Sequence, residues 1–266
     1  MNIVLLGCGH MGSWLAHELS REHRLAVYDT DGTKSECGRG IVRLGRLEDI
    51  REIKPDLLVN AVTLHHTVAA FKEVTPFLPR ECILSDVASI KGKIADYYKE
   101  AGFRFVSVHP MFGPTFANMK KPLRENGVII SESCKEGQDL FVKLFIRLGV
   151  RVFTYSFEEH DRMMAYSLTT PFLASLTFAA CVDAAAVPGT TFARHMTLAR
   201  KLLAEDDHLL AEILFNPYSL EELAKITSRL EFLKHIVMAR DYDEARAFFA
   251  RLRENIGDDT GGPQET

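Results

Sequence analysis

The chain opens with the stretch MNIVLLGCGHMG, residues 1–12, in which a short apolar run leads into three spaced glycines. The spacing G-x-G-x-x-G, placed between a strand and a helix, is typical of a dinucleotide-binding loop. Gly7 allows a tight turn, Gly9 lets the backbone approach a diphosphate, and Gly12 lets the helix pack on the strand. A diphosphate there would also meet the free N–H groups at the start of the helix. We expect the following loop residues to bind the cofactor: Gly7, Gly9, His10, Met11 and Gly12.

An acidic residue follows the second apolar run at the position where such loops bind the adenosine ribose. Asp29 closes the run Leu25–Tyr28 and lies 20 residues after Gly9, which is the usual spacing for this contact. Its carboxylate would repel a 2′-phosphate, and no arginine follows it immediately, so we predict NAD rather than NADP. Thr63, after a later apolar run, is expected near the nicotinamide.

Strand and helix patterns alternate through the first 155 residues, which predicts an α/β domain with a mostly parallel sheet. The expected strands are Asn2–Leu6, Leu25–Tyr28, Leu57–Val62, Ile83–Asp86, Phe103–Val108, Gly127–Ser131 and Val150–Tyr155. The expected helices between them are Met11–Leu19, Val68–Leu78, Lys91–Ala101 and Glu136–Leu148.

After residue 155 the pattern is helical only, so an all-α domain is expected over residues 156–256. Its predicted helices are Phe157–Ala186, Thr191–Ala204, His208–Phe215, Ser219–Ala239 and Asp241–Asn255. Within the first of them, Tyr166–Val182 carries no charge but is short for a membrane span and contains Pro171, so we expect a buried helix. About 100 helical residues with this much apolar surface are expected to complete their core against a second subunit. The polar, glycine-rich residues 257–266 are expected to form a disordered tail.

Composition excludes several classes of partner. The 32 basic and 36 acidic residues give a net charge of −4, so the chain has no general attraction for nucleic acid or anionic membranes. The five cysteines are scattered without a C-x-x-C pair. They favour reduced thiols in a cytoplasmic protein. Adjacent histidines such as His65 and His66 point apart on most backbones, so no metal site is expected.

Two polar clusters follow later strands, at the sheet edge where open α/β proteins bind their ligands. The first is Ser85–Lys91 (SDVASIK) and the second is His109–Pro114 (HPMFGP). A histidine at the end of a strand suits a base that accepts a hydroxyl proton, since its pKa lies near neutrality. A histidine that shapes a turn between prolines is an equally good interpretation of His109 from the pattern alone.

With these residues in view, the sequence resembles the prephenate dehydrogenase family. The motifs that carry the resemblance are HPMFGP at 109–114, D-x-x-S-x-K at Asp86–Lys91 and EHD at Glu159–Asp161, and it spans nearly all of residues 1–256. The resemblance implies a Rossmann-type doubly wound parallel sheet followed by an all-α dimerisation domain in a homodimer. It also implies the oxidation of prephenate by NAD⁺ with loss of carbon dioxide, giving 4-hydroxyphenylpyruvate in tyrosine biosynthesis.

The same resemblance assigns roles to residues of the two clusters. His109 would accept the proton of the ring hydroxyl, and Ser89 would share that hydroxyl and orient the imidazole. No acid is needed for the carbon–carbon bond that breaks, because aromatisation of the ring drives that step. Lys91 would neutralise a carboxylate or link the two domains, unless it is a solvated lysine at a helix start.

Prephenate is a dianion, so the resemblance implies cations from the helical domain. We favour Arg200 as the carboxylate ligand, then Lys201, with Arg194 third, because a planar guanidinium binds a carboxylate in a bidentate way.

The chain departs from the family in the long helix. Many relatives carry histidines in an S-H-x-P-H stretch where this chain has Leu168–Phe172 (LTTPF). Thr169 could bind substrate there but cannot carry charge. For His160 and Asp161, a structural role at the helix start and a catalytic role are equally good predictions.

Three alternatives stay open from the sequence. Arogenate could replace prephenate as substrate, and a dinucleotide-binding dimer without catalysis would share most of these features. A hydroxyacid or 6-phosphogluconate-type dehydrogenase would need a lysine in the interdomain helix, and Phe157–Ala186 contains none.

Overall fold

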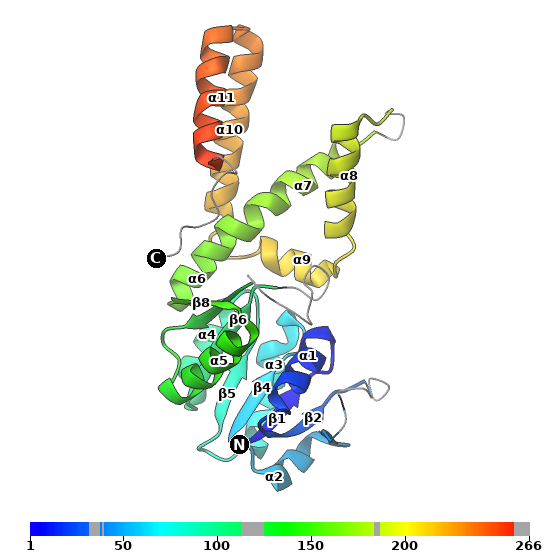
Figure 1. Cartoon of the computed structure of the whole chain (residues 1–266), viewed down its shortest axis with the longest axis vertical. Coiled ribbons are helices and arrows are strands. Elements are labelled where there is room, and N and C mark those ends of the chain that lie inside the picture. The colour runs from blue at the N-terminus through cyan, green and yellow to red at the C-terminus, as the bar shows by residue number, and fades with distance from the viewer. Residues whose placement is uncertain (32–37, 39, 113–124, 184–186, 258–266) are drawn as a thin grey trace. The chain divides into compact units, whose positions relative to one another are not determined.

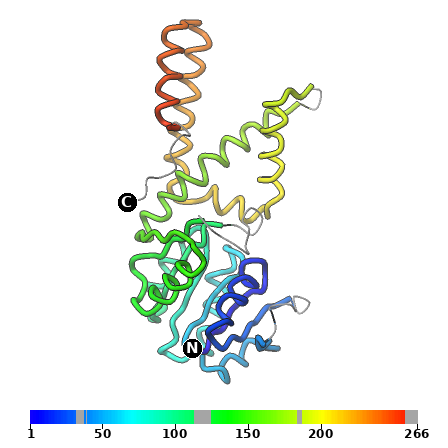
Figure 2. The backbone as a smooth tube through the Cα atoms, viewed as in Figure 1, coloured from blue at the N-terminus to red at the C-terminus, as the bar shows by residue number. Residues whose placement is uncertain are grey.

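The computed structural model describes residues 1–31, 38, 40–112, 125–183 and 187–257, and it contains one large sheet followed by helices (Figures 1 and 2). The sheet order is β3-β2-β1-β4-β5-β6-β7-β8, and all pairs are parallel except β6 with β7. The strands are β1 (Asn2–Leu6), β2 (Arg24–Tyr28), β3 (Val42–Arg43), β4 (Leu57–Asn60), β5 (Ile83–Asp86), β6 (Phe105–Pro110), β7 (Asn126–Ile130) and β8 (Arg151–Tyr155). This architecture confirms the predicted α/β sheet followed by helices.

Helices cover both faces of the sheet because the side chains of each buried strand alternate between two apolar cores. Ile3 and Leu5 of β1 contribute to the core under α1 and α5, whereas Val4 and Leu6 contribute to the core under α2, α3 and α4. The covering helices are α1 (His10–Leu19), α2 (Ile50–Ile53), α3 (Thr67–Val74), α4 (Gly92–Ala101) and α5 (Lys135–Leu148). The carboxyl ends of β1, β4, β5 and β6 therefore meet at one edge, where the polar clusters lie.

One short strand and one short α-helix were not predicted from the sequence. β3 has two residues and α2 has four, which is too little chain for a periodic pattern. In addition, the prediction that His109 follows the strand is wrong. His109 belongs to β6, where it pairs with Val128 of antiparallel β7. That pairing fixes the backbone of His109 within the sheet.

After β8 the described chain is helical, as predicted, but the first long helix differs from the prediction. It consists of α6 (Phe157–Met164), a π-helical turn η4 (Ala165–Thr169) and α7 (Thr170–Ala180). It therefore ends as regular helix at Ala180 rather than Ala186. Pro171 lacks a backbone N–H, and a π-turn just before it is one way for a helix to accommodate a proline.

The expectation that this helix is buried is wrong for α7. None of its residues is buried, although its sequence TPFLASLTFAA is almost entirely apolar. Along the described residues, no helix has the length and apolarity needed to cross a bilayer. The helix α8 (Thr190–Leu202) packs beside α7 and is followed by α9 (Asp207–Leu214).

The chain forms two compact units, Met1–Ser219 and a second that begins at Leu220. In the second unit, α10 (Ser219–Ala239) and α11 (Tyr242–Ile256) are joined by Arg240, which has a left-handed φ of 54°. Their contact includes Phe232 against Phe248, with ring centroids 5.2 Å apart. The change to all-helical structure thus comes before the division into units, and a domain boundary near residue 155 stays a prediction. Residues 258–266 of the expected tail lie outside the described residues.

The cysteines correct one further expectation. Cys82, Cys134 and Cys181 carry free thiols, but Cys8 is disulfide-bonded, so reduced thiols were the wrong prediction for Cys8. Sequence spacing alone cannot show which cysteines a fold brings together.

Candidate active site

The glycine-rich loop has the geometry that its sequence predicts. Gly7 has a φ of +91°, and a Cβ there would lie 2.9 Å from the carbonyl oxygen of Ala61. A Cβ on Gly12 would lie 1.9 Å from the carbonyl oxygen of Gly7, so the helix can approach the loop only through a glycine. A Cβ built on Gly9 would meet no atom within 4 Å. Gly9 is the N-cap residue of α1, and no side chain there bonds the first N–H groups of the helix. The loop therefore offers an uncovered helix N-terminus, which suits an anion.

Asp29 lies at the end of β2 beside this loop. One carboxylate oxygen accepts a hydrogen bond from the backbone N–H of Cys8 at 2.6 Å, and the other accepts from Asp31 at 2.8 Å. The two bonds hold the carboxylate at the rim of a cavity of about 380 Å³. Among the residues that line this cavity are Gly7, Gly9, Asp29, Thr30, Thr63 and Glu73. The structure thus brings Gly7, Gly9, Asp29 and Thr63 together around one cavity.

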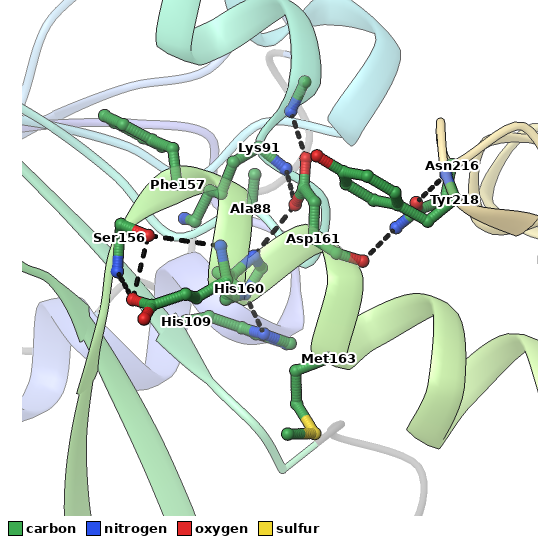
Figure 3. A network of polar contacts seen from close by, with 12 residues as sticks. Ala88, Lys91, His109, Ser156, Phe157, His160, Asp161, Met163, Asn216 and Tyr218 are labelled. Atoms are coloured by element: carbon green, nitrogen blue, oxygen red, sulfur yellow. Dashed lines mark hydrogen bonds and ion pairs between the residues drawn. The ribbon is translucent and has the colours of Figure 1, made fainter.

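A chain of three buried side chains leads away from His109 (Figure 3). The Nδ1 atom of His109 lies 3.0 Å from Nε2 of His160, and Nδ1 of His160 lies 2.9 Å from Oδ1 of Asp161. His109 is 8% exposed and His160 is fully buried. Within the described part of the chain, no hydrogen bond is made to Nε2 of His109. That nitrogen is therefore the one through which His109 can act on a ligand.

The Asp161 side chain ties α6 to the segment between β5 and α4. Its carboxylate accepts hydrogen bonds from the backbone N–H groups of Lys91 at 2.8 Å and Gly92 at 2.7 Å. Its carbonyl oxygen accepts from Nδ2 of Asn216 at 2.8 Å. Because every oxygen of Asp161 is bonded, the whole residue is fixed in position.

Lys91 is not a solvated lysine, because its side chain is fully buried. Its ammonium donates to a carboxylate oxygen of Asp86 at 2.6 Å and to the carbonyl oxygen of Val108 at 2.7 Å. The other carboxylate oxygen of Asp86 accepts from the hydroxyl of Tyr98 at 2.9 Å. Lys91 thus neutralises a carboxylate of the protein itself and holds the end of β5 to the residue before His109.

The buried position keeps both histidines uncharged. Burial, followed by the neighbouring His160 and Lys91, holds the pKa of His109 well below its ordinary value. Burial is also the largest cause that lowers the pKa of His160, while the hydrogen bond to Asp161 acts in the opposite direction. A neutral imidazole has a lone pair that can accept a proton, so His109 is present in the form that a general base requires.

Ser89 and Thr169 have different environments. Ser89 lies half-buried between β5 and α4, and it makes no hydrogen bond among the described residues. Thr169 is 1% exposed, and its hydroxyl lies 3.4 Å from the carbonyl oxygen of Ile213 and 3.2 Å from the hydroxyl of Ser219. Ser89 is thus free to bond a ligand, whereas Thr169 already has partners within the protein.

The cationic residues predicted for substrate binding lie on α8, and all three are exposed: Arg194, Arg200 and Lys201. Of the HPMFGP motif, His109–Phe112 are described, and Gly113 and Pro114 lie outside the described residues. Phe112 packs against Trp14 of α1 with ring centroids 5.1 Å apart. This contact joins the histidine motif to the helix of the glycine-rich loop.

The prediction that His65 and His66 point apart is wrong. Their ring centroids are 3.8 Å apart. His65 also stacks on His208 of α9, with centroids 4.6 Å apart. Even so, no group of three His, Cys, Asp or Glu side chains in the described ranges is arranged to hold a metal ion.

The sequence left His160 between a structural role at the helix start and a catalytic role. The EHD motif carried the residue, but its contact with His109 spans 51 positions along the chain. Only the folding of α6 against the end of β6 brings the two imidazoles together.

Comparisons with known proteins agree with this arrangement. Residues 15–148, half of the chain, match the family model described as prephenate dehydrogenase, nucleotide-binding domain. A curated relative from Methanocaldococcus jannaschii, named probable arogenate/prephenate dehydrogenase, is 23% identical over 90% of this chain. The T-protein of Enterobacter agglomerans is 23% identical over 76% of this chain. The chain spans 57% and 56% of the length of these two relatives.

Among solved structures, the prephenate dehydrogenase from A. aeolicus in complex with hydroxyphenyl propionate and NAD⁺ has the same fold. The TM-score is 0.82 at 16% identity, and the match covers 96% of each chain. The family match begins after the glycine-rich loop and includes the described residues of the His109 motif. The chain belongs to the prephenate dehydrogenase family.

Proposed function

We propose that the chain is an NAD-dependent dehydrogenase that oxidises prephenate, with loss of carbon dioxide, to 4-hydroxyphenylpyruvate. The observation that carries this proposal is the imidazole of His109. It is neutral and buried, and its Nε2 is unbonded within the described residues. It lies at the same sheet edge as the glycine-rich loop. A dehydrogenase that acts on a ring alcohol needs one such base beside its cofactor.

NAD is the cofactor that the loop fits best. The open N-terminus of α1 would hold the diphosphate, and Asp29 at the cavity rim would bond the ribose hydroxyls. Both carboxylate oxygens of Asp29 are fixed by backbone N–H groups, so the negative charge stays where a 2′-phosphate would have to lie. The A. aeolicus relative was solved with NAD⁺ bound, which supports the same choice here.

The reaction needs little from the protein beyond position and one base. Bound NAD⁺ supplies the acceptor for the hydride that leaves the ring. His109 accepts the proton of the ring hydroxyl at Nε2, and Ser89, which is half-buried and has no partner among the described residues, orients that hydroxyl. Aromatisation then releases carbon dioxide without an acid catalyst.

The substrate carboxylates require positively charged side chains of the protein. The ammonium of Lys91 has Asp86 and Val108 as partners and is fully buried, so it serves the protein rather than the substrate. We assign the carboxylates to α8, with Arg200 first, then Lys201 and Arg194, because a guanidinium binds a carboxylate in a bidentate way. Thr169 would contribute only through the shape of the pocket wall.

The active form is proposed to be a homodimer through the helical region. The helix α7 is apolar and only partly buried, and α8 exposes Leu198 to 59%. A surface of this kind on a single chain indicates a partner, and a second copy would cover it by symmetry.

A direct assay tests the reaction and its nearest alternative. The purified protein is mixed with NAD⁺ and either prephenate or arogenate, and the appearance of NADH absorbance is followed. We expect turnover with prephenate. Turnover with arogenate alone would favour the other substrate that the Methanocaldococcus relative's name carries. If neither substrate produced NADH, the chain would be a dinucleotide-binding protein without this activity.

A further inference from the structure

We propose that His160, held by Asp161, is a positioning residue that fixes the tautomer and ring orientation of His109. This inference rests on the proposed function for its kinetic part only. The structural part concerns which nitrogen of His109 carries a proton, and that question can be answered without any substrate.

The tautomers follow from the partners along the chain of side chains. A carboxylate oxygen only accepts hydrogen bonds, so Oδ1 of Asp161, 2.9 Å away, requires the proton of His160 on Nδ1. The Nε2 atom of neutral His160 is then an acceptor. It lies 3.0 Å from Nδ1 of His109, so His109 must carry its own proton on Nδ1. The lone pair of His109 is therefore left on Nε2, the nitrogen without a partner among the described residues.

The surroundings exclude the opposite arrangement. A charged His160 would donate from both nitrogens and would place the proton of His109 on Nε2, where it blocks proton uptake. Burial lowers the pKa of His160, and the ammonium of Lys91 lowers it further. The groups that act on this pair are Asp86 at the end of β5, Lys91 just before α4 and Asp161 from α6. They maintain a neutral pair with one defined direction of hydrogen bonding.

Asp161 can set the direction of hydrogen bonding along the two histidines because its carboxylate is held in one orientation. Its two carboxylate oxygens accept from the backbone of Lys91 and Gly92, and Asn216 holds its carbonyl oxygen. When His109 takes up a proton, its Nδ1–H still donates to His160. The carboxylate then offsets the new positive charge across one imidazole, as an aspartate does beside a catalytic histidine.

Two substitutions at one position test the kinetic part. His160→Leu removes the acceptor for Nδ1–H of His109, and we expect kcat to fall by about 10²-fold with little change in KM. His160→Gln places an amide oxygen near the former Nε2 and should recover most of that loss. His235→Gln, on exposed α10, is the matched control and should match the wild type. A wild-type kcat in the Leu variant, or equal losses in the Leu and Gln variants, would overturn the proposal.

A spectroscopic test is independent of turnover. The protein is labelled with ¹⁵N-histidine, and two-bond ¹H–¹⁵N correlations identify the protonated nitrogen of each ring, with His109 assigned by its loss in His109→Asn. We expect Nδ1–H on His109 in the wild type and loss of that single tautomer in His160→Leu. A wild type with Nε2–H on His109 contradicts the proposal, whether or not the protein oxidises prephenate. The converse result, the expected tautomer without turnover, would count against the proposed function alone.

Discussion

A base that works from a buried position has to stay uncharged there, and the residues around His109 achieve this by burial and by a neighbouring cation. Lys91 pairs with Asp86 at 2.6 Å in a site with no exposure for either side chain. Removal of one partner from such a pair leaves a buried charge without compensation and is strongly destabilising. Lys91 therefore has two effects at the residue scale: its ammonium holds β6 through the carbonyl oxygen of Val108, and its positive charge lowers the pKa of both histidines.

Replacement of His109 by Asn should remove the base without disturbing the fold. We expect kcat to fall by about 10²-fold or more, because the amide cannot accept the proton. The dissociation constant of NAD⁺ should stay within about twofold of the wild type, since the glycine-rich loop follows a different strand. Steady-state kinetics and a cofactor titration measure the two quantities. An unchanged kcat would remove His109 from the proposed role.

The lowered pKa values predict a stability that depends on pH in one direction. Below the ordinary histidine pKa near 6.5, the unfolded chain binds protons at His109 and His160 that the folded chain does not. The free energy of unfolding is therefore fully retained above about pH 6.5 and falls as the pH drops, by up to about 1.4 kcal/mol per pH unit for each site.

Thermal melts at a series of pH values measure this effect. The fall in Tm between about pH 6.5 and pH 5 should be less steep in His109→Asn than in the wild type, because one of the two sites is gone. Identical slopes in the two proteins would show that His109 titrates alike in the folded and unfolded chains.

At the scale of elements, two glycines at the start of α1 have different roles. A Cβ at Gly12 meets the carbonyl oxygen of Gly7 at 1.9 Å, whereas a Cβ at Gly9 meets nothing within 4 Å. Gly12 is thus required for packing within the protein, and Gly9 is required only by what binds there.

These two glycines give a matched pair of variants. Gly12→Ala should lower the free energy of unfolding by about 1–3 kcal/mol, because the helix must move away from the loop. Gly9→Ala should leave the stability near that of the wild type but weaken NAD⁺ binding by about tenfold or more, since the methyl group would occupy the space of the diphosphate. Denaturant unfolding and cofactor titration separate the two effects, and equal stabilities of the two variants would contradict this account.

The sequence predicted those parts of the fold and site that are encoded over a short distance. The glycine spacing and Asp29 lie within one βαβ unit, and the period of the apolar residues located nearly every strand. The contact between His109 and His160 spans 51 positions, and that between Lys91 and Asp161 spans 70, so no local pattern carries them. The sequence also did not predict the burial of Lys91, because a lysine at the start of a helix is usually solvated.

At the scale of the whole molecule, a chain of charge −4 combines one well-packed sheet domain with helices that expose much apolar surface. Large apolar side chains that are more than half exposed occur on several of these helices and the segments beside them: Tyr166, Val187, Leu198, Leu203, Phe215, Leu220, Val237, Met238, Tyr242 and Ile256. The sheet domain has fewer such residues. The assembly we propose therefore involves the helical region.

A charge placed on this surface should weaken the dimer. Leu198→Glu on α8 would bury a carboxylate at the interface, and we expect the dissociation constant of the dimer to rise by about tenfold or more. Ile146→Glu on α5, at a position with 66% exposure outside the helical region, is the control and should leave the dimer intact. Analytical ultracentrifugation measures both. A wild type that is monomeric at all concentrations would contradict the proposed assembly.

The edge-to-face contact of Trp14 with Phe112 has a practical consequence. Trp14 is the single tryptophan of the chain, and its ring meets that of Phe112 at 86°. All indole fluorescence therefore originates at the junction between the cofactor helix and the histidine motif. Reduced nicotinamide absorbs in the range where indole emits, so resonance energy transfer from Trp14 would let unlabelled wild-type protein report the arrival and departure of NADH in real time.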